Sequence, residues 1–271
     1  MFSCPAPEDS PPRILKRKRS TPEPLTPPLS LNDSENARLL DRAVHVLSTA
    51  ATALSQVTFL YQSDPVAQDG LVRAVDCVTN VNDKGGKLII CGVGKSGLIG
   101  GKMVATMKSL GLGASFLHAA EAIHGDLGDI RGNDAVLFIS YSGKTSELLT
   151  VLDHIPESVP ILAITSQTNM SECVLLEERP DAILLPAPIH ELEEVSFGVC
   201  APTTSTTVAI AIGDMLALTV ADNIHRDDTK RVFKRNHPGG AIGARARNKA
   251  RTVDTKVEVR REQNTGLVSP A

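Results

Sequence analysis

The sequence predicts a doubly wound, three-layer α/β fold, in which helices cover both faces of a sheet of about five parallel strands. Five short apolar runs are separated by segments with helical spacing. Continuous apolar runs are typical of parallel strands buried on both faces, and the intervening helices supply the crossovers. With 271 residues, of which 42% are hydrophobic, the chain is long enough to bury such a core.

The first 35 residues differ in composition from the rest, since residues 1–35 hold 8 of the 17 prolines. Such a segment cannot bury enough apolar surface to offset the entropy of ordering it, so a disordered arm is expected. Its basic run, Lys16–Arg19, is interpreted either as a nuclear-import signal or as part of a solvated linker.

A helical segment over 36–82 is expected to precede the sheet. Apolar side chains recur at helical spacing from Leu39 to Leu60, and a second helix is predicted from Pro65 to about Val81. This segment packs either on the following domain or on a partner subunit. The second helix is expected to face inward with Leu71, Val72, Val75 and Val78.

The α/β core is expected over 86–225, with each strand followed by a helix or a loop. Its predicted strands are Lys87–Cys91, Ala114–Leu117, Ala135–Ser140, Pro160–Thr165 and Asp181–Leu185. Its predicted helices are Ser96–Leu110, Thr145–Asp153, Asn169–Leu176 and Thr203–Asn223. The polar tail at 246–271 is expected to fray.

Composition excludes several functional classes. A net charge of −3 and a pI of about 6.2 argue against a nucleic-acid partner. We expect no membrane span, since no stretch approaches the ~20 apolar residues that one needs. The polar, Pro-rich start lacks the apolar region of a secretion signal. Five scattered cysteines without a CxxC pair indicate neither disulfides nor a zinc site, so a cytoplasmic protein with no metal and no cofactor is expected.

The segment Gly92–Gly97 follows a strand, opens a helix and satisfies the GxGxxG pattern. A P-loop would need glycine at Ile89, so that interpretation fails. A dinucleotide site would need an acidic residue at the end of the next strand, but Glu121 comes three residues after His118. Two interpretations remain: an anionic ligand approaching the backbone at a helix start, or a tight turn without a ligand.

A second loop, Ser140–Thr145, occupies the same position in a later strand–helix unit. The hydroxyls of Ser140, Ser142 and Thr145 would meet free N–H groups at the helix start, which predicts a phosphate cradle. Thr145 could instead merely cap the helix. Glu147 follows within one turn and is either a catalytic carboxylate beside the cradle or a complement to the helix dipole.

Further polar residues lie in the C-terminal half. The acidic run at Glu191, Glu193 and Glu194 is interpreted as a solvated loop, and it precedes the hydroxyl run at 203–207. His124 and His237 both lie in glycine-bearing loops, where a histidine is either structural, exposed or catalytic.

Taken together, these motifs resemble the sugar isomerase (SIS) domain of the arabinose-5-phosphate isomerases, the KpsF/GutQ group. The resemblance rests on six segments in the same order and covers about residues 36–245. The segments are Gly92–Gly97, Glu121–Gly128, Ser140–Glu147, Ala201–Thr207, Gly213–Asp214 and His237–Gly243.

This resemblance implies a flavodoxin-like five-stranded parallel sheet and an enzyme that interconverts D-arabinose 5-phosphate and D-ribulose 5-phosphate. Members are usually tetramers with active sites at subunit interfaces, so a homo-oligomer, a tetramer or a dimer, is expected, and a histidine could come from a neighbouring chain. The implied catalytic set is Lys95, Glu147, Glu194 and His237. The implied substrate-binding set is Ser96, Ser140, Ser142, Thr145, His124 and Thr203.

The sequence departs from the family pattern at the cradle. Tyr141 stands where the family usually has Asn, which adds bulk to the sugar pocket, and Lys144 stands where it usually has Glu, which adds positive charge near a phosphate. Because fewer than 30 residues follow Gly243, the CBS modules of many members are not expected.

The chemistry implied by the resemblance is proton transfer through a cis-enediol. A carboxylate removes the C2 proton of the open-chain aldose, and a proton returns to C1. Glu147 or Glu194 would be the base, with position favouring Glu147; Lys95 would stabilise the enediolate, and His237 would assist ring opening. The rival hypothesis is a non-catalytic sugar-phosphate sensor, which would need the cradle but not the carboxylates.

Overall fold

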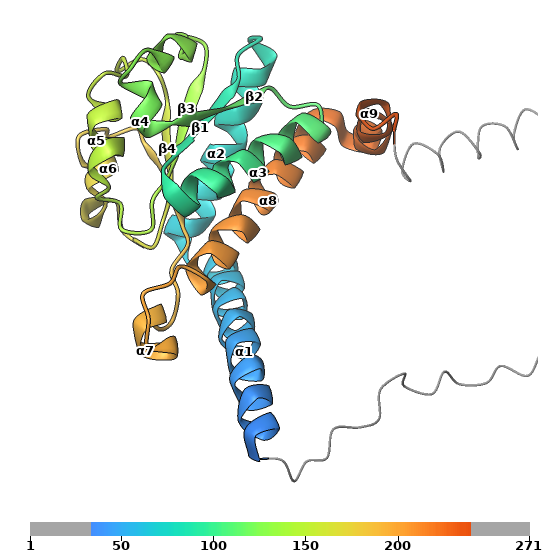
Figure 1. Ribbon diagram of the computed structural model, residues 1–271. Helices are drawn as coiled ribbons and strands as arrows, with labels where there is room; N and C mark the ends of the chain where they lie inside the picture. The colour runs from blue at the N-terminus through green and yellow to red at the C-terminus, as the bar shows by residue number, and fades with distance from the viewer. Residues whose placement is uncertain (1–33, 240–271) are drawn as a thin grey trace, which may run out of the picture. The chain divides into compact units, whose positions relative to one another are not determined.

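The computed structural model describes residues 34–239 (Figure 1). The basic run Lys16–Arg19, almost all of the expected arm and the 246–271 tail lie outside this range. The strands are β1 (Leu88–Gly92), β2 (Ala114–His118), β3 (Ala135–Ile139), β4 (Ile161–Thr165) and β5 (Ile183–Pro186). The helices are α1 (Ser34–Ser63), α2 (Pro65–Asp83), α3 (Gly94–Ser109), α4 (Ala119–Ala122), α5 (Ser146–Leu152), α6 (Val174–Glu177), α7 (Glu193–Phe197), α8 (Thr204–His225) and α9 (Thr229–Asn236).

The five strands form one parallel sheet in the order β2-β1-β3-β4-β5. The α/β prediction is therefore confirmed. After β1 the chain moves outward to β2 and then crosses back to β3, so the strand order reverses between β1 and β3. In open sheets of this kind, ligands bind outside the carboxyl ends of the strands at such a switch point.

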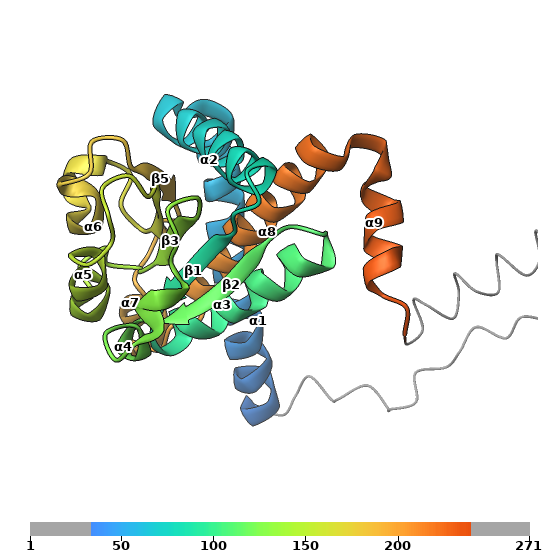
Figure 2. The ribbon, with the colours of Figure 1, turned by 90° about the horizontal axis from the view of Figure 1, so that it is seen from above.

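Helices cover both faces of the sheet. As a result, every residue of β1, β3 and β4 is buried. Alternate side chains of β1 enter two separate cores: Leu88 and Ile90 belong to one, and Ile89 and Cys91 to the other. Figure 2 shows α2, α3 and α8 on one face and α5 and α6 on the other. These layers hold the carboxyl ends of the strands in place.

Helices α3 and α8 approach each other closely at Gly213. A Cβ added there would lie 2.5 Å from Sδ of Met103, so only glycine allows this crossing without a shift. One residue further on, Asp214 forms an ion pair with Lys102 of α3. The absence of a side chain at Gly213 therefore allows the two helices to approach, and the Lys102–Asp214 ion pair links them beside this point.

The N-terminal helices form as predicted, but their buried faces differ from the expectation. The chain divides into two units with the boundary between Val44 and His45, so the first turns of α1 belong to the N-terminal unit. In α1 the buried side chains include Ala53 and Val57, whereas Leu39 and Leu47 are exposed. In α2, Val75 and Val78 are buried as predicted, but Val72 is exposed. Helical spacing thus predicted where the helices lie along the chain, but not which of their apolar faces is buried.

Two helical segments are long and apolar enough to cross a membrane, Glu35–Ser63 and Thr204–Asn236. The expectation that no stretch reaches this length is therefore wrong. The finding rests on length and composition alone, and a buried core helix passes the same test. Half of the apolar window in the second segment is buried inside the protein, as a core helix requires.

The amino edge of the sheet carries a buried charge. The Asp134 side chain is 2% exposed and accepts hydrogen bonds from the backbone N–H groups of Lys87 and Arg131, both at 2.9 Å. Nζ of Lys87 lies 2.8 Å from the same carboxylate. Burial raises the pKa of Asp134, but the hydrogen bonds and the charge of Lys87 outweigh it and hold the pKa below its usual value.

Candidate functional site

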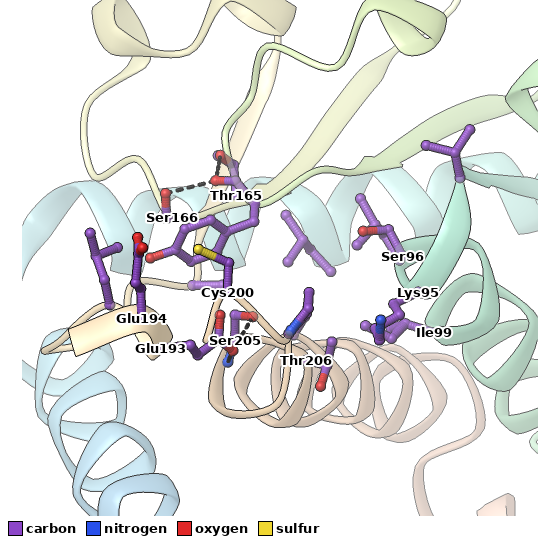
Figure 3. Close-up of a pocket in the computed structure, with 18 residues that line it drawn as sticks. Lys95, Ser96, Ile99, Thr165, Ser166, Glu193, Glu194, Cys200, Ser205 and Thr206 are labelled. Atoms are coloured by element: carbon purple, nitrogen blue, oxygen red, sulfur yellow. Dashed lines mark hydrogen bonds between the residues drawn. The ribbon is translucent and has the colours of Figure 1, made fainter. Parts of the chain in front are cut away.

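A cavity of about 450 Å³ lies at the carboxyl edge of the sheet (Figure 3). Lys95, Ser96 and Ile99 of α3 form one side, and Glu193 and Glu194 of α7 lie on the other. The remaining lining residues come from the carboxyl ends of the strands, the segments that flank α7 and the start of α8. They are Val93, Ile139, Tyr141, Ile164, Thr165, Ser166, Ala187, Leu192, Cys200, Pro202, Ser205, Thr206 and Ala209.

The glycine turn after β1 delivers Lys95 and Ser96 to the cavity. Gly94 has a φ of +54°, which favours glycine. A Cβ at Gly92 would lie 3.0 Å from the backbone N of Gly97, and one at Gly97 would lie 3.2 Å from the carbonyl oxygen of Gly92. Close packing of strand on helix thus accounts for these glycines, without a ligand. The exposed side chain of Lys95 is not needed for that packing.

The loop after β3 forms a closed hydroxyl network. Oγ of Ser140 lies 2.8 Å from Oγ1 of Thr145 and accepts a hydrogen bond from the N–H of Gly143 at 3.1 Å. The N–H of Lys144 donates to Oγ of Ser142 at 3.2 Å. Thr145 occupies the N-cap position of α5, but its hydroxyl makes no capping hydrogen bond. The simple capping interpretation of Thr145 is therefore wrong.

This loop, residues 140–145, adjoins the cavity without contributing all of its polar side chains to it. Tyr141 lines the cavity, whereas Ser140, Ser142 and Thr145 do not. Ser140 is buried at 2% exposure, and Ser142 is exposed. The predicted cradle and the cavity are thus neighbouring parts of the same edge.

Glu147 lies in the first turn of α5 and is exposed. It does not line the cavity. Its carboxylate accepts a hydrogen bond from Oγ of Ser146 at 3.0 Å. Hydrogen bonds from its own backbone N–H and from Ser146 hold the pKa of Glu147 below the ordinary value. The group is therefore ionised at neutral pH, at the rim of the cradle.

The acidic run does not form the solvated loop that we expected. It contains the short helix α7, which ends at Gly198 with a φ of +76°. Oε1 of Glu193 accepts three hydrogen bonds from the start of α8: the N–H of Thr203 at 2.7 Å, the N–H of Ser205 at 3.0 Å and Oγ of Ser205 at 2.7 Å. Glu193 therefore caps α8 and fixes α7, and both Glu193 and its neighbour Glu194 line the cavity.

Two weak acids in the lining keep their protons at neutral pH. A hydrogen bond to Glu194, followed by burial and the charges of Glu194 and Glu193, raises the pKa of Cys200. Burial and then the charge of Glu193 raise the pKa of Tyr141, against a smaller opposite effect of a hydrogen bond with Ser166. The Cys200 thiol donates a hydrogen bond to the Glu194 carboxylate, and the neutral Tyr141 hydroxyl remains a hydrogen-bond donor or acceptor.

Besides the cradle residues and Glu147, three further predicted site residues do not line the cavity. His124 is exposed in the turn after α4, and Thr203 is exposed at the N-cap of α8, where its neighbours Ser205 and Thr206 line the cavity instead. The ring of His237 stacks on Phe233 with centroids 4.1 Å apart, and its Nε2 lies 3.3 Å from Oγ of Ser109.

His237 lies at the end of α3 that is far from the cavity. It contacts Ser109, the last residue of that helix, whereas Lys95 lies near the first residue. At 1.5 Å per residue these two ends are about 20 Å apart. Within one chain, the structure therefore brings together Lys95, Ser96 and Glu194, but not His237.

Several lining residues were missed by the sequence analysis, above all Thr165, the last residue of β4, and Ser166, which follows it. The carbonyl oxygen of Tyr141 accepts hydrogen bonds from both hydroxyls, at 3.1 Å and 2.7 Å. The sequence did contain a signal for these two residues. The predicted strand 160–165 ends in Thr165 and is followed by Ser166, much as the predicted strand 135–140 ends in Ser140. Cys200 carried no comparable pattern.

Comparison with known proteins finds related sequences and folds. The SIS domain family matches residues 82–219. Arabinose 5-phosphate isomerase GutQ of Escherichia coli K12 is 38% identical over 186 residues, which are 67% of this chain and 53% of the relative. An uncharacterized Helicobacter pylori J99 protein is 38% identical over 204 residues, or 74% of this chain and 57% of the relative. The chain thus spans little more than half the length of these relatives.

Solved structures agree in fold. An Escherichia coli CFT073 protein in complex with A5P is 27% identical, with a TM-score of 0.59 over 72% of this chain and 97% of that one. A Bacteroides fragilis protein involved in capsule formation is 30% identical, with a TM-score of 0.61 over 74% and 98%.

Proposed function

Because this chain belongs to the SIS domain family, we propose that it is an aldose–ketose isomerase of a phosphorylated sugar, D-arabinose 5-phosphate. The observation that carries the proposal is the placement of Lys95 and Glu194 on opposite sides of one cavity, beside a loop of hydroxyls. The named function of the relatives, arabinose 5-phosphate isomerase, supports the same substrate. We expect the reaction to occur in the cytoplasm and without a cofactor.

The phosphate is held by the loop 140–145. Ser142 is exposed there, Lys144 adds a positive charge, and the first N–H groups of α5 are unpaired within the helix. Ser96, in the first turn of α3, lines the same cavity as Tyr141 of this loop. Anchoring the phosphate positions the rest of the sugar, which converts proton transfer into a step between preorganised groups.

The proton transfer is assigned to Glu194. Its carboxylate takes the proton from C2 of the open-chain aldose, which leaves a cis-enediol, and returns a proton to C1 to give the ketose. Lys95, on the facing wall, stabilises the negative charge that develops on the carbonyl oxygen. Glu147 was favoured from position in the sequence, but its place outside the lining makes it a residue of the cradle rim in this proposal.

His237 assists ring opening from a second copy of the chain. About 20 Å separates the two ends of α3, so His237 cannot reach the cavity of its own subunit. A homo-oligomer, dimer or tetramer, would place the end of one subunit's α3 near another subunit's cavity. His124, exposed at the carboxyl edge, is available to the same interface.

A non-catalytic sugar-phosphate sensor is the second candidate. The observation that favours it is that Glu147 and His237 both lie away from the cavity of a single chain. A sensor would keep the cradle but would not need Glu194 and Lys95 to face each other across the ligand.

The deciding experiment is an NMR time course of the purified protein with D-arabinose 5-phosphate in D₂O. We expect D-ribulose 5-phosphate to accumulate and deuterium to enter C2 of the recovered aldose. Tight binding without exchange or product would favour the sensor and reject the isomerase.

A further inference from the structure

Tyr141 is shared between the cradle and the cavity. Of the described residues 140–145, it alone lines the cavity, and its backbone belongs to the loop that carries Ser140, Ser142 and Thr145. A ligand held by its phosphate at the loop must therefore pass the Tyr141 ring to reach Glu194.

The backbone of Tyr141 is held on both sides. Its carbonyl oxygen accepts three hydrogen bonds, from Oγ1 of Thr165 at 3.1 Å and from Oγ and N–H of Ser166 at 2.7 and 2.9 Å. The preceding residue, Ser140, is buried and bonded to Thr145. The ring is therefore attached to a fixed backbone position and moves only by rotation about its own side-chain torsions.

The opposite anchor is also fixed. Glu194 lies on α7, and α7 is tied to the start of α8 by the three hydrogen bonds of Glu193. The distance between phosphate site and base is thus set by two rigid elements. Extra carbons in a longer sugar would have to bulge sideways, towards the Tyr141 ring and the apolar part of the lining.

We propose that Tyr141 is the chain-length-determining residue, whose ring restricts the site to five-carbon aldose phosphates and excludes six-carbon ones. This inference rests on the proposed function and deepens it. The ring acts by its bulk, so its hydroxyl is dispensable for selection. Tyr141 is 37% exposed and lines the cavity, so it has surface that a sugar can contact.

The test compares Tyr141→Ala with Tyr141→Phe on D-arabinose 5-phosphate and on a six-carbon aldose 6-phosphate. An apolar wall discriminates a single extra carbon by about 10- to 200-fold in kcat/KM. We expect Tyr141→Ala to reduce the five- over six-carbon ratio by about tenfold or more, through a gain on the longer sugar. Tyr141→Phe, which keeps the ring, should leave the ratio within about threefold of the wild type.

Equal loss on both sugars in Tyr141→Ala, or a ratio that changes as much in Tyr141→Phe, would overturn the inference. Circular dichroism and the melting temperature establish that each variant is folded. Calorimetric binding of the unreactive five- and six-carbon alditol phosphates provides a second readout. If the wild type turns over no sugar, the proposed isomerase fails, but the ratio of the two dissociation constants still tests the ring.

Discussion

The roles of two adjacent carboxylates, Glu193 and Glu194, can be separated by the same substitution. Both side chains line the cavity, but Glu193→Gln removes the charge from the oxygen that caps α8, whereas Glu194→Gln alters the proposed base. Both changes preserve side-chain size. We expect the first to lower stability and the second to lower turnover.

The magnitude for Glu193 follows from its contacts. One oxygen accepts three hydrogen bonds at 2.7, 3.0 and 2.7 Å. The glutamine carbonyl can still accept them, but hydrogen bonds to a charged group contribute about 1.5–3 kcal/mol and neutral ones about 0.5–1.5 kcal/mol. The favourable charge at the N-terminus of α8 adds about 0.3–1 kcal/mol. Since Glu193 is partly exposed, we expect a net loss of about 1–2 kcal/mol.

Thermal unfolding followed by circular dichroism measures this loss. A change of 1 kcal/mol shifts the melting temperature by about 2–4 °C for a domain of this size, so Glu193→Gln should melt about 2–8 °C lower. Glu194→Gln is the matched control: its melting temperature should stay close to that of the wild type while kcat falls about 10²–10⁴-fold. Equal shifts in the two variants, or a thermally unchanged Glu193→Gln, would refute the capping role.

Three further predictions concern the cradle, the buried charge and the arm. Ser142→Ala combined with Thr145→Ala should raise KM strongly, because each hydrogen bond to a charged phosphate is worth about 1.5–3 kcal/mol; a change below about twofold in a folded variant would misplace the cradle. Asp134 has a lowered pKa in the folded state, so its stabilisation is present above the unfolded pKa of about 3.9 and is lost as pH falls through the folded value. Asp134→Asn should therefore unfold at lower temperature at pH 7, and the gap to the wild type should narrow in acid; a constant gap across that range would contradict the ion-pair account. Deleting residues 1–33 should leave turnover and melting temperature nearly unchanged, since Pro-rich polar sequence contributes little burial, whereas a collapse in solubility or activity would show that the segment packs on the domain.

The sheet was predictable from the sequence because buried parallel strands leave a strong local signal. All five predicted strands lie within two residues of β1–β5 at each boundary. The predicted helix at Asn169–Leu176 is split into a short 3₁₀ turn and α6, since its residues follow the strand without a long periodic stripe. Short helices such as α7 depend on contacts with other elements, which no local pattern announces.

The candidate site was predictable in location but not in composition. Parallel strands bring their carboxyl ends to one edge, so Lys95 and Ser140 could be placed near each other from the sequence. The distinction between Glu193 and Glu194 could not, because it depends on where α8 begins relative to α7. The same holds for Thr203 and Thr206, since only the start of α8 decides which hydroxyls face the cavity.

The crossing of α3 and α8 at Met103 and Gly213 has a mechanical consequence for the site. Lys95 and Ile99 precede Met103 by two turns and one turn of α3, and Ala209 precedes Gly213 by one turn of α8. The two helices therefore cross at Gly213, and their residues that line the cavity lie one to two helical turns from this crossing. A methyl group added at Gly213 would lie 2.5 Å from Sδ of Met103 and would displace that side chain, so the packing beneath the cavity depends on a residue that does not line it.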